Sequence, residues 1–504
     1  MGGSRAHLTS GRTLVRSATW FFFGELVPLL AAIVALPLII HSLGVERFGV
    51  LAIAWGVIGY FALLDLGIGR ALTREVSIML GSHRDAEIRE TARIALLAMA
   101  MMGLLGAVPL FLLSPWFAGE LFRIAPSLEE ESRWVFRLLA LLLPMVMATA
   151  AAHAVLVAYQ RFDILSKVRI PQGLLVYLGP LLVLPFTSSL SVIVGVLLAV
   201  RFVSMVVLVR ACFGVMPSSP VVGLRMNRLV PLLKMGGWVT VSNVVGPLMV
   251  YLDRFVIGAL ISVSAVAFYV TPYDLVTKLW LIPSAVVATL FPAFSASASH
   301  NADRLASLYE KGIGYITIFI FPAVLILSVF AEDGLRLWLG PEFAEQSTAV
   351  VQWLAIGVFI NSIAHVPFAL LQGTGRADLT AKLHIIELPF YVVACVWLII
   401  HYGIIGAAVA WSARVIVDAI LLLWLARRLL PTQAEWLLLV TTWMVMVLVW
   451  VVGTLLTGQM VKLMYVGAIM VLHGFFVWNV LLGEQERHHV IHLVKWPWIS
   501  RGSK

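Results

Sequence analysis

Long apolar runs recur along the whole chain, and they constrain its fold more than any motif does. Of its 504 residues, 61% are hydrophobic and only 12% are charged, and the mean hydropathy is +0.99. Soluble domains carry about twice that share of charged residues. A run of about 20 apolar residues is what an α-helix needs to cross a bilayer. The sequence therefore predicts an all-α, polytopic integral membrane protein.

Windows of that length place about 14 transmembrane helices along the chain. They lie near 18–40, 48–68, 93–114, 135–158, 168–186, 189–211, 235–260, 264–292, 312–331, 349–371, 382–401, 404–426, 434–456 and 461–482. The least distinct boundaries are Phe186 to Ser189 and His401 to Gly403. The first run is longer than the ~7–15-residue core of a signal peptide, so we expect it to stay as an uncleaved span.

The basic residues indicate topology. Most of the 35 lysines and arginines fall on the side that holds the N-terminus, so the positive-inside rule predicts that both termini are cytoplasmic. They are scattered through short connections, which argues against a nucleic-acid partner despite the net charge of +9.

No connection is long enough for a catalytic domain, so we expect no enzyme activity. Cys212 and Cys395 offer neither metal-ligand spacing nor a disulfide framework, so we expect no metal and no cofactor.

An internal repeat is visible when the first and seventh spans are aligned at an offset of 218 residues. The turn at 43–49 then falls on 261–267, and a second echo links 159–163 with 371–378. The repeat predicts two pseudo-symmetric six-helix bundles plus two C-terminal helices. The predicted parts are an N-terminal bundle at 1–211, a cytoplasmic linker at 212–234, a C-terminal bundle at 235–430, the extra helices at 431–483 and a cytoplasmic tail at 484–504.

Charges inside the predicted spans mark the candidate functional residues, because a charge at the centre of a span costs ~2.5–3.5 kcal/mol on insertion scales. The cations are Arg201, Arg254, Lys278 and Arg414, and the acids are Glu25, Asp253, Asp274, Glu387 and Asp418. Such residues usually face a bundle interior or a watery cavity. The chain is therefore a candidate transporter.

Several of these charges also have structural interpretations. Asp253 and Arg254 are neighbours, about 100° apart on a helix, so each is expected to find its partner on another helix. Asp274 and Lys278 have the i to i+4 spacing of an intrahelical ion pair, with the acid in the favourable first position. A structural ion pair and a functional site both remain open for these residues.

The remaining charges leave similar alternatives. Arg414 and Asp418 share the i to i+4 spacing in the reverse order. Arg201 has no partner nearby in sequence, and either snorkels to the cytoplasmic rim, pairs across helices or binds a ligand. Glu25 has no cation within the next helical turn, and either couples movement to an ion gradient or pairs with Arg254 or Lys278.

Residues near the predicted rims are interpreted structurally. Glu387 is expected to be solvated there, and Asp65 is expected to pair with Arg70 or Arg74 at a helix end. Single histidines, namely His365, His384 and His473, are interpreted as core or rim residues. Prolines in three spans, Pro28, Pro37, Pro247, Pro272, Pro283 and Pro292, predict kinks that either serve packing or act as hinges.

Five stretches of sequence carry a family resemblance. They are Leu43-Gly-Val-Glu-Arg-Phe-Gly-Val50, Leu63-Leu-Asp-Leu-Gly-Ile-Gly-Arg-Ala-Leu72, Tyr159-Gln-Arg-Phe-Asp163, Asp253-Arg-Phe-Val-Ile-Gly258 and Leu371-Gln-Gly-Thr-Gly-Arg-Ala-Asp-Leu-Thr-Ala-Lys382. In this order they resemble the polysaccharide-transporter flippases, the O-antigen and exopolysaccharide branch of the multidrug/oligosaccharidyl-lipid/polysaccharide exporter superfamily.

The resemblance implies a bacterial inner-membrane flippase that moves a polyprenyl-pyrophosphate-linked oligosaccharide from the cytoplasmic to the periplasmic leaflet by alternating access. Arginine and lysine donors suit phosphate oxygens, which makes Arg254, Arg201, Lys278 and Arg414 the expected substrate contacts. The expected coupling acids are Glu25, Asp253 and Asp274. Expected partners are the lipid-linked substrate, membrane lipids and polysaccharide polymerase or export proteins.

Three other functions stay open. A cation-coupled multidrug exporter would share the superfamily fold, and it would use intramembrane acids. A lipid-linked peptidoglycan-precursor flippase would place cations early in the chain, where this sequence has Glu25. A membrane polysaccharide polymerase or ligase is disfavoured, because it needs a large outer loop.

Overall fold

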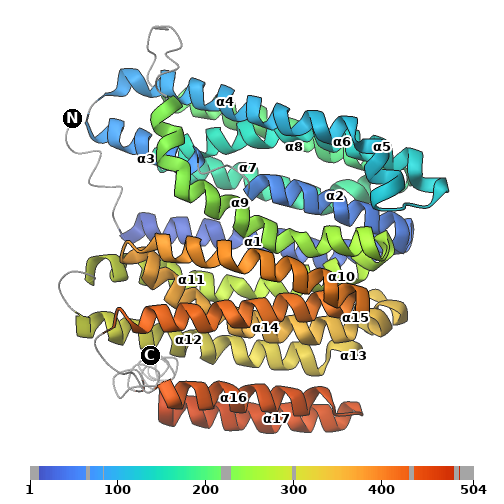
Figure 1. Ribbon diagram of the computed structural model, residues 1–504, viewed down its shortest axis with the longest axis vertical. Helices are drawn as coiled ribbons and strands as arrows, with labels where there is room; N and C mark the ends of the chain where they lie inside the picture. The colour runs from blue at the N-terminus through green and yellow to red at the C-terminus, as the bar shows by residue number, and fades with distance from the viewer. Residues whose placement is uncertain are drawn as a thin grey trace, which may run out of the picture. The chain divides into compact units, whose positions relative to one another are not determined.

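Every regular element in the described residues is helical. The computed structural model describes residues 11–63, 68–82, 84–216, 229–297, 302–430, 436–481 and 487. Figure 1 shows the helices coloured from the N-terminus to the C-terminus, and no strand occurs in these ranges. The prediction of an all-α polytopic protein is confirmed.

The helices follow the apolar runs with short breaks between them. Their bounds are α1 Gly11–Leu43, α2 Val45–Leu63, α3 Ile68–Gly81, α4 Asp85–Leu112, α5 Ser114–Trp116, α6 Pro126–Ala158, α7 Phe162–Val183, α8 Leu190–Val215, α9 Leu229–Leu260, α10 Val263–Thr277, α11 Leu281–Ser297, α12 Ala302–Val329, α13 Ala331–Leu339, α14 Pro341–Gly373, α15 Ala377–Arg427, α16 Trp436–Thr454 and α17 Gln459–Phe476. A 3-10 turn, Lys278–Trp280, joins α10 to α11.

Eight helical stretches in the described ranges are long and apolar enough to cross a membrane. That number differs from the predicted 14 partly because α15 counts once. Its 51 residues would extend about 76 Å if straight, more than twice a bilayer core of ~30 Å. The exact number of spans remains a prediction.

The long helix α15 reverses where the sequence predicts a break. Gly403 has φ 60° and ψ −142°, which is not helical. Three residues later, a Cβ on Gly406 would overlap the Leu398 carbonyl, so the two arms approach too closely for any side chain. The predicted boundary at His401 to Gly403 is therefore confirmed. The other uncertain boundary is confirmed too, because α7 ends at Val183 and α8 begins at Leu190.

The chain divides into two compact units. The first contains residues 1–271 and 381–410, and the second contains 272–380 and 411–504. The divisions fall inside α10, immediately before Pro272, and inside α15. These packing units are drawn differently from the predicted six-helix bundles, which group residues by sequence repeat. The bundle boundaries stay a prediction.

The core of the first unit is built on α6, which packs against α4 and α8, while α1 packs on α7. The buried side chains follow helical spacing, as at Ala151 and Val155 of α6 and Leu208 and Cys212 of α8. The short helix α3 joins this core through Leu72, Val76 and Met79, spaced i, i+4 and i+7. No predicted span corresponds to α3, because its apolar face is shorter than the run of about 20 residues that marks a span.

A polar clamp involving the family-like stretch at 43–50 holds one rim of the first unit. The Arg47 guanidinium donates to the Ser188 carbonyl at 2.6 Å and lies 3.2 Å from Glu131 Oε2. Glu131 Oε1 in turn accepts the Leu190 N–H at 2.5 Å, which caps the first turn of α8. Arg47 therefore ties the start of α2 to α6 and α8, and its role is structural.

The predicted echo between 159–163 and 371–378 is visible in the backbone. Gln160 and Gly375 both have positive φ, and Arg161 and Arg376 each donate their backbone N–H back across the turn, to Leu156 and Leu371. Each arginine also bonds an aspartate two residues on, Asp163 at 2.9 Å and Asp378 at 3.4 Å. The hydrogen bond from Arg161 holds the pKa of Asp163 below its ordinary value.

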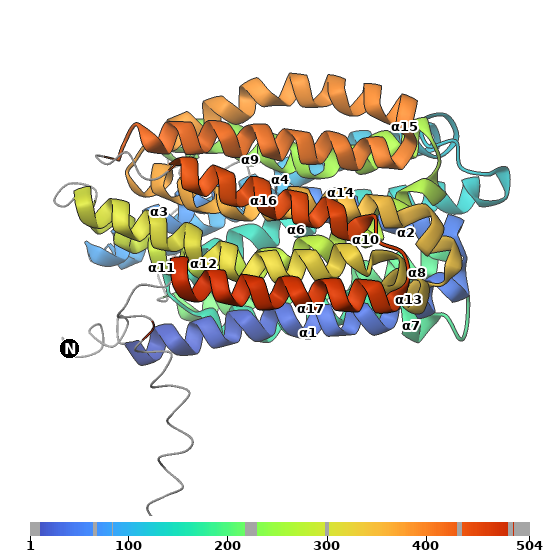
Figure 2. The ribbon, with the colours of Figure 1, turned by 90° about the horizontal axis from the view of Figure 1, so that it is seen from below.

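The second unit carries a C-terminal helical hairpin, α16 and α17, and both helices pack on α12 (Figure 2). Lys462 of α17 donates to Asp333 of α13 at 2.7 Å, and this contact lowers the pKa of the Asp333 carboxyl. His473 of α17 lies 3.2 Å from the Ile318 carbonyl and against the Phe321 ring. The interpretation of His473 as a packing residue is confirmed.

A glycine allows α2 and α10 to approach closely in the first unit. A Cβ on Gly49 of α2 would overlap the carbonyl of Val263, the first residue of α10, and would lie 2.5 Å from its carbonyl carbon. Because this neighbour is backbone, it cannot turn aside. We therefore expect Gly49→Ala to lower the free energy of unfolding by about 1–3 kcal/mol or more, as an overpacked core does. Thermal unfolding in detergent measures this.

Gly195 supplies the matched control. It lies inside α8, and a Cβ there would meet nothing within 4 Å. Gly195→Ala should raise stability slightly, by up to about 1 kcal/mol, because alanine favours the helix. Equal melting temperatures for Gly49→Ala and the unmodified chain would contradict the close approach of α2 and α10.

Candidate functional site

Asp253 and Arg254 are both buried in α9. Asp253 is fully buried, and its carboxylate accepts a short hydrogen bond from the Tyr269 hydroxyl of α10. Its second oxygen accepts the Arg254 backbone N–H at 2.8 Å. The expectation that Asp253 finds a partner on another helix is confirmed, since Tyr269 is one such partner. Both donors offset the cost of burying the carboxylate.

Arg254 lies in a seam between α9 and α2. Its guanidinium carbon is 4.9 Å from the centre of the Tyr251 ring, a distance at which the cation is attracted to the ring face. Tyr251 and Arg254 are three residues apart and so share one face of α9. Across from them, Gly56 lies beside the Arg254 side chain and Gly59 beside the Tyr251 ring. The glycines make room for two large side chains that a bulkier α2 would exclude.

A sequence signal for this seam exists in α2. Gly56 and Gly59 are spaced i, i+3, so they share one helix face, and small residues are enriched where membrane helices pack closely. Only 4% of the Arg254 surface is exposed. Its chemistry therefore depends on how α2 and α9 pack.

Arg201 lies on the buried stripe of α8. Leu197, Ser204 and Leu208 are buried and are spaced from Arg201 by four, three and seven residues, so all four share one face. Phe202 and Val203, on the opposite side, are exposed. Among the described residues Arg201 has no ion pair or side-chain hydrogen bond. Arg201 is a half-buried cation in the middle of an apolar helix. Its place on the buried face of α8 argues against a side chain that snorkels to the rim.

Lys278 and Asp274 lie where α10 passes into a 3-10 turn. Helix α10 ends at Thr277, so Lys278 is the first residue of that turn. Lys278 is exposed and Asp274 is partly buried. The intrahelical pair between them stays a prediction.

Arg414 and Asp418 lie on the second arm of α15, in the second unit. Arg414 is half-buried and Asp418 is buried, and Trp411 lies on the same face. Trp411 contacts the Tyr273 and Trp280 rings at 5.6 and 6.2 Å. This part of the second unit is therefore an aromatic cluster with an arginine and an aspartate one to two helical turns away.

His365 borders the same cluster. Its ring lies 6.2 Å from that of Trp280, and its Nδ1 is 2.8 Å from the Asn361 carbonyl. The expected structural role of His365 is confirmed.

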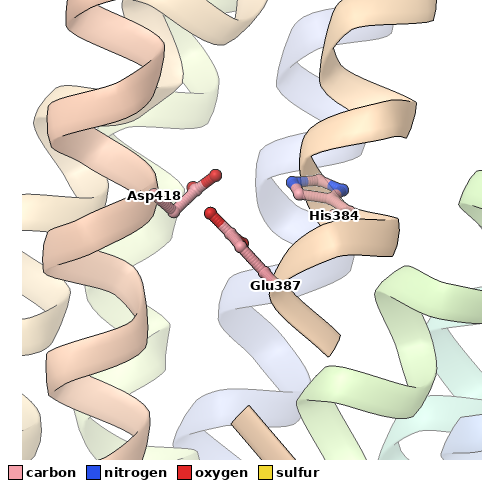
Figure 3. Close-up of side chains that lie close together, drawn as sticks. All are labelled: His384, Glu387 and Asp418. Carbon is pink, nitrogen blue, oxygen red and sulfur yellow. The ribbon is translucent and has the colours of Figure 1, made fainter. Parts of the chain in front are cut away.

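Glu387 is buried, so the expectation of ordinary solvation at the rim was wrong. Its exposed fraction is 7%, because α15 turns this residue inward. Figure 3 shows His384 and Glu387 about one turn apart on the first arm of α15, with Asp418 labelled on the second arm, in the other unit. In the first unit these side chains offer two ligand atoms, fewer than the three or four of protein zinc sites. We propose no metal there.

Two of the predicted acids, Glu25 and Asp65, have side chains outside the described residues. Glu25 lies on α1, in a stretch whose side chains are outside the described residues. Asp65 lies outside them altogether. Both cysteines are buried thiols, Cys212 on α8 and Cys395 on α15.

The Tyr269 hydroxyl can be tested by removing it. Tyr269→Phe leaves a fully buried carboxylate with one donor fewer, so we expect the free energy of unfolding to fall by about 1–3 kcal/mol. Tyr309→Phe is the control, because Tyr309 is fully buried and its hydroxyl has no hydrogen-bond partner among the described residues. Thermal unfolding should give a lower melting temperature for Tyr269→Phe than for Tyr309→Phe. A control that melts as low as Tyr269→Phe would contradict the role given to this hydrogen bond.

Two proteins with similar sequences are named as transport proteins. A putative O-antigen transporter of Shigella flexneri is 29% identical over 421 residues, which cover 83% of this chain and 98% of that protein. The succinoglycan biosynthesis transport protein ExoT of Rhizobium meliloti is 23% identical over 374 residues, covering 73% of this chain and 70% of that one.

Solved transporters share the fold. The lipid II flippase MurJ, in an inward closed conformation, matches 93% of this chain and all of its own with a TM-score of 0.68 at 12% identity. An inward-facing multidrug resistance MATE family transporter matches 80% of this chain and 94% of its own with a TM-score of 0.64 at 14% identity. At such identities these likenesses concern the fold alone.

The model of one protein family matches residues 42–348, more than half of the chain. That range includes α2, with its clamp arginine, and the buried charges of α9. The chain belongs to the polysaccharide biosynthesis protein family.

Proposed function

We propose that this protein is a flippase that moves a polyprenyl-pyrophosphate-linked oligosaccharide from the cytoplasmic to the outer leaflet by alternating access. Its family, its likeness to O-antigen and succinoglycan transporters, and a fold shared with a lipid II flippase support this. The proposed location is the bacterial inner membrane with both termini cytoplasmic. A polysaccharide polymerase or export protein is a proposed partner.

The substrate explains why interior cations are needed. Its head carries a pyrophosphate and hydrated sugars, which cannot cross hydrocarbon alone because burying an unpaired charge is very costly. Arginine forms charge-assisted, often bidentate hydrogen bonds with phosphate oxygens. The lipid tail can remain in the bilayer while such a cation accepts the head.

Arg201 is the observation that carries the proposal furthest. It is a cation on the inward face of an apolar helix, with no carboxylate partner in the described ranges, and such residues commonly mark substrate paths in membranes. Arg254 is the second proposed phosphate contact, and it becomes available only if the α2–α9 seam opens. Lys278 and Arg414, in the second unit, are further proposed phosphate contacts.

Ion coupling is proposed for Glu25, Asp253 and Asp274. The three differ in their surroundings, since Asp253 already accepts a tyrosine hydroxyl and a backbone N–H while Asp274 is partly exposed. A carboxylate that exchanges protons or ions must reach water at some stage of the cycle. Asp274 fits that condition better than Asp253.

Transport into sealed vesicles tests the function. Purified protein is reconstituted, labelled polyprenyl-pyrophosphate oligosaccharide is added, and its appearance in the inner leaflet is followed. We expect Arg201→Ala to lower the rate by about 10-fold or more, the loss that follows when a hydrogen bond to a charged group is removed. Arg201→Lys should retain part of the rate, because it keeps the charge but not the planar fork.

Arg336→Ala is the matched control. Arg336 lies on α13, is largely exposed and pairs with Glu332 at 2.7 Å. It should transport at the normal rate. Normal transport by both Arg201→Ala and Arg254→Ala would rule out their phosphate role. Failure of the unmodified chain to move the lipid, together with export of cationic drugs, would favour the multidrug alternative.

A further inference from the structure

The second unit contains an apolar groove that the proposed substrate path does not use. Its volume is about 940 Å³, and residues of the second arm of α15 and of α16 line it together with Ile360 of α14. The walls contain aliphatic side chains, such as Ile416 on α15 and Leu448 on α16, and the aromatic side chain of Trp443 on α16. Ile420, Met444 and Leu448 are more than half exposed, so the groove opens sideways. In a membrane that opening faces the lipid.

One end of the groove is positively charged. Arg427 lines it at the last residue of α15, and the next residue, Arg428, lies with its guanidinium carbon 3.6 Å from the centre of the Trp424 ring. Trp424 also lines the groove, so the ring fixes the second cation at the mouth. Tryptophan and arginine together suit the level where hydrocarbon meets lipid headgroups. The mouth therefore favours an anion attached to apolar chains.

The length of the groove indicates which lipid fits. Along α15 its lining extends from Ile416 to Arg427, which at 1.5 Å per residue is about 17 Å. Half of a bilayer core is ~15 Å. The groove is thus one leaflet deep, with its cations at headgroup level. A diacyl phospholipid has that length, whereas a polyprenyl chain long enough to span both leaflets does not.

We propose that this groove is a binding site for an anionic phospholipid, with the acyl chains between α15 and α16 and the phosphate beside Arg427 and Arg428. Basic sites between transmembrane helices commonly bind such headgroups. The bound lipid packs α16 against α15, so it stabilises the C-terminal hairpin. In the proposed orientation this lipid belongs to the cytoplasmic leaflet.

Lipid binding to the purified full chain tests the proposal. The protein in detergent is mixed with phosphatidylglycerol or with phosphatidylcholine of the same acyl chains, separated from unbound lipid, and its bound lipid is measured by mass spectrometry along with its melting temperature. We expect phosphatidylglycerol to be retained more and to raise the melting temperature more. The double variant Arg427→Gln, Arg428→Gln should lower affinity for phosphatidylglycerol by about fivefold per arginine.

Two further variants separate the groove from general charge effects. Arg376→Gln removes a cation at the other end of α15, outside the groove, and should keep the preference for phosphatidylglycerol. Ile420→Trp narrows the groove from an exposed position and should lower retention of both lipids with the arginines intact.

Three results would overturn the proposal. The first is equal retention of the two phospholipids, and the second is an equal loss of preference in Arg376→Gln. The third is displacement of phosphatidylglycerol by a small molar fraction of polyprenyl phosphate, which would assign the groove to the transported lipid instead. The vesicle assay on the same variants is independent, because loss of this lipid site leaves Arg201 unchanged.

Discussion

Burying ionised side chains inside apolar helices is the constraint on which the rest of this structure depends. In α9 an acid and a base are adjacent, and both side chains are almost completely buried. The acid is stabilised by Tyr269 of α10, and the base lies on Tyr251 beside two glycines of α2. Both solutions require α2, α9 and α10 to pack closely, and Gly49 brings α2 against the first residue of α10. The same contacts that shape the first unit therefore determine how its charges are presented.

The family-like stretches have unequal roles. Arg47 clamps a rim through Glu131 and Ser188, and Arg161 pairs with Asp163 to form a turn that recurs at Arg376. These residues hold the fold. Arg201 lies outside those stretches, yet it is the cation whose surroundings best suit an anionic ligand. Motif matching alone would therefore select residues that stabilise the fold, and it would leave out Arg201.

Apolar periodicity predicted most helices and both uncertain breaks, because a span of known thickness leaves little choice of length. It missed α3, whose short amphipathic face resembles a loop, and it could not count the spans merged in α15. Glu387 was misplaced because distance to a predicted rim does not say which way a helix face points. Partners across helices, such as Tyr269, depend on packing that spacing does not encode.

The central claim is that Arg201 borders water on the path of an anionic lipid head. Cysteine labelling tests it directly, in a chain with Cys212 and Cys395 replaced by alanine and a single cysteine at position 201 or 203. A charged, membrane-impermeant thiol reagent should label position 201, while position 203 on the exposed face stays unlabelled in lipid. A cysteine at 201 that remains as unreactive as one at 203, from both sides of the membrane, would contradict the account.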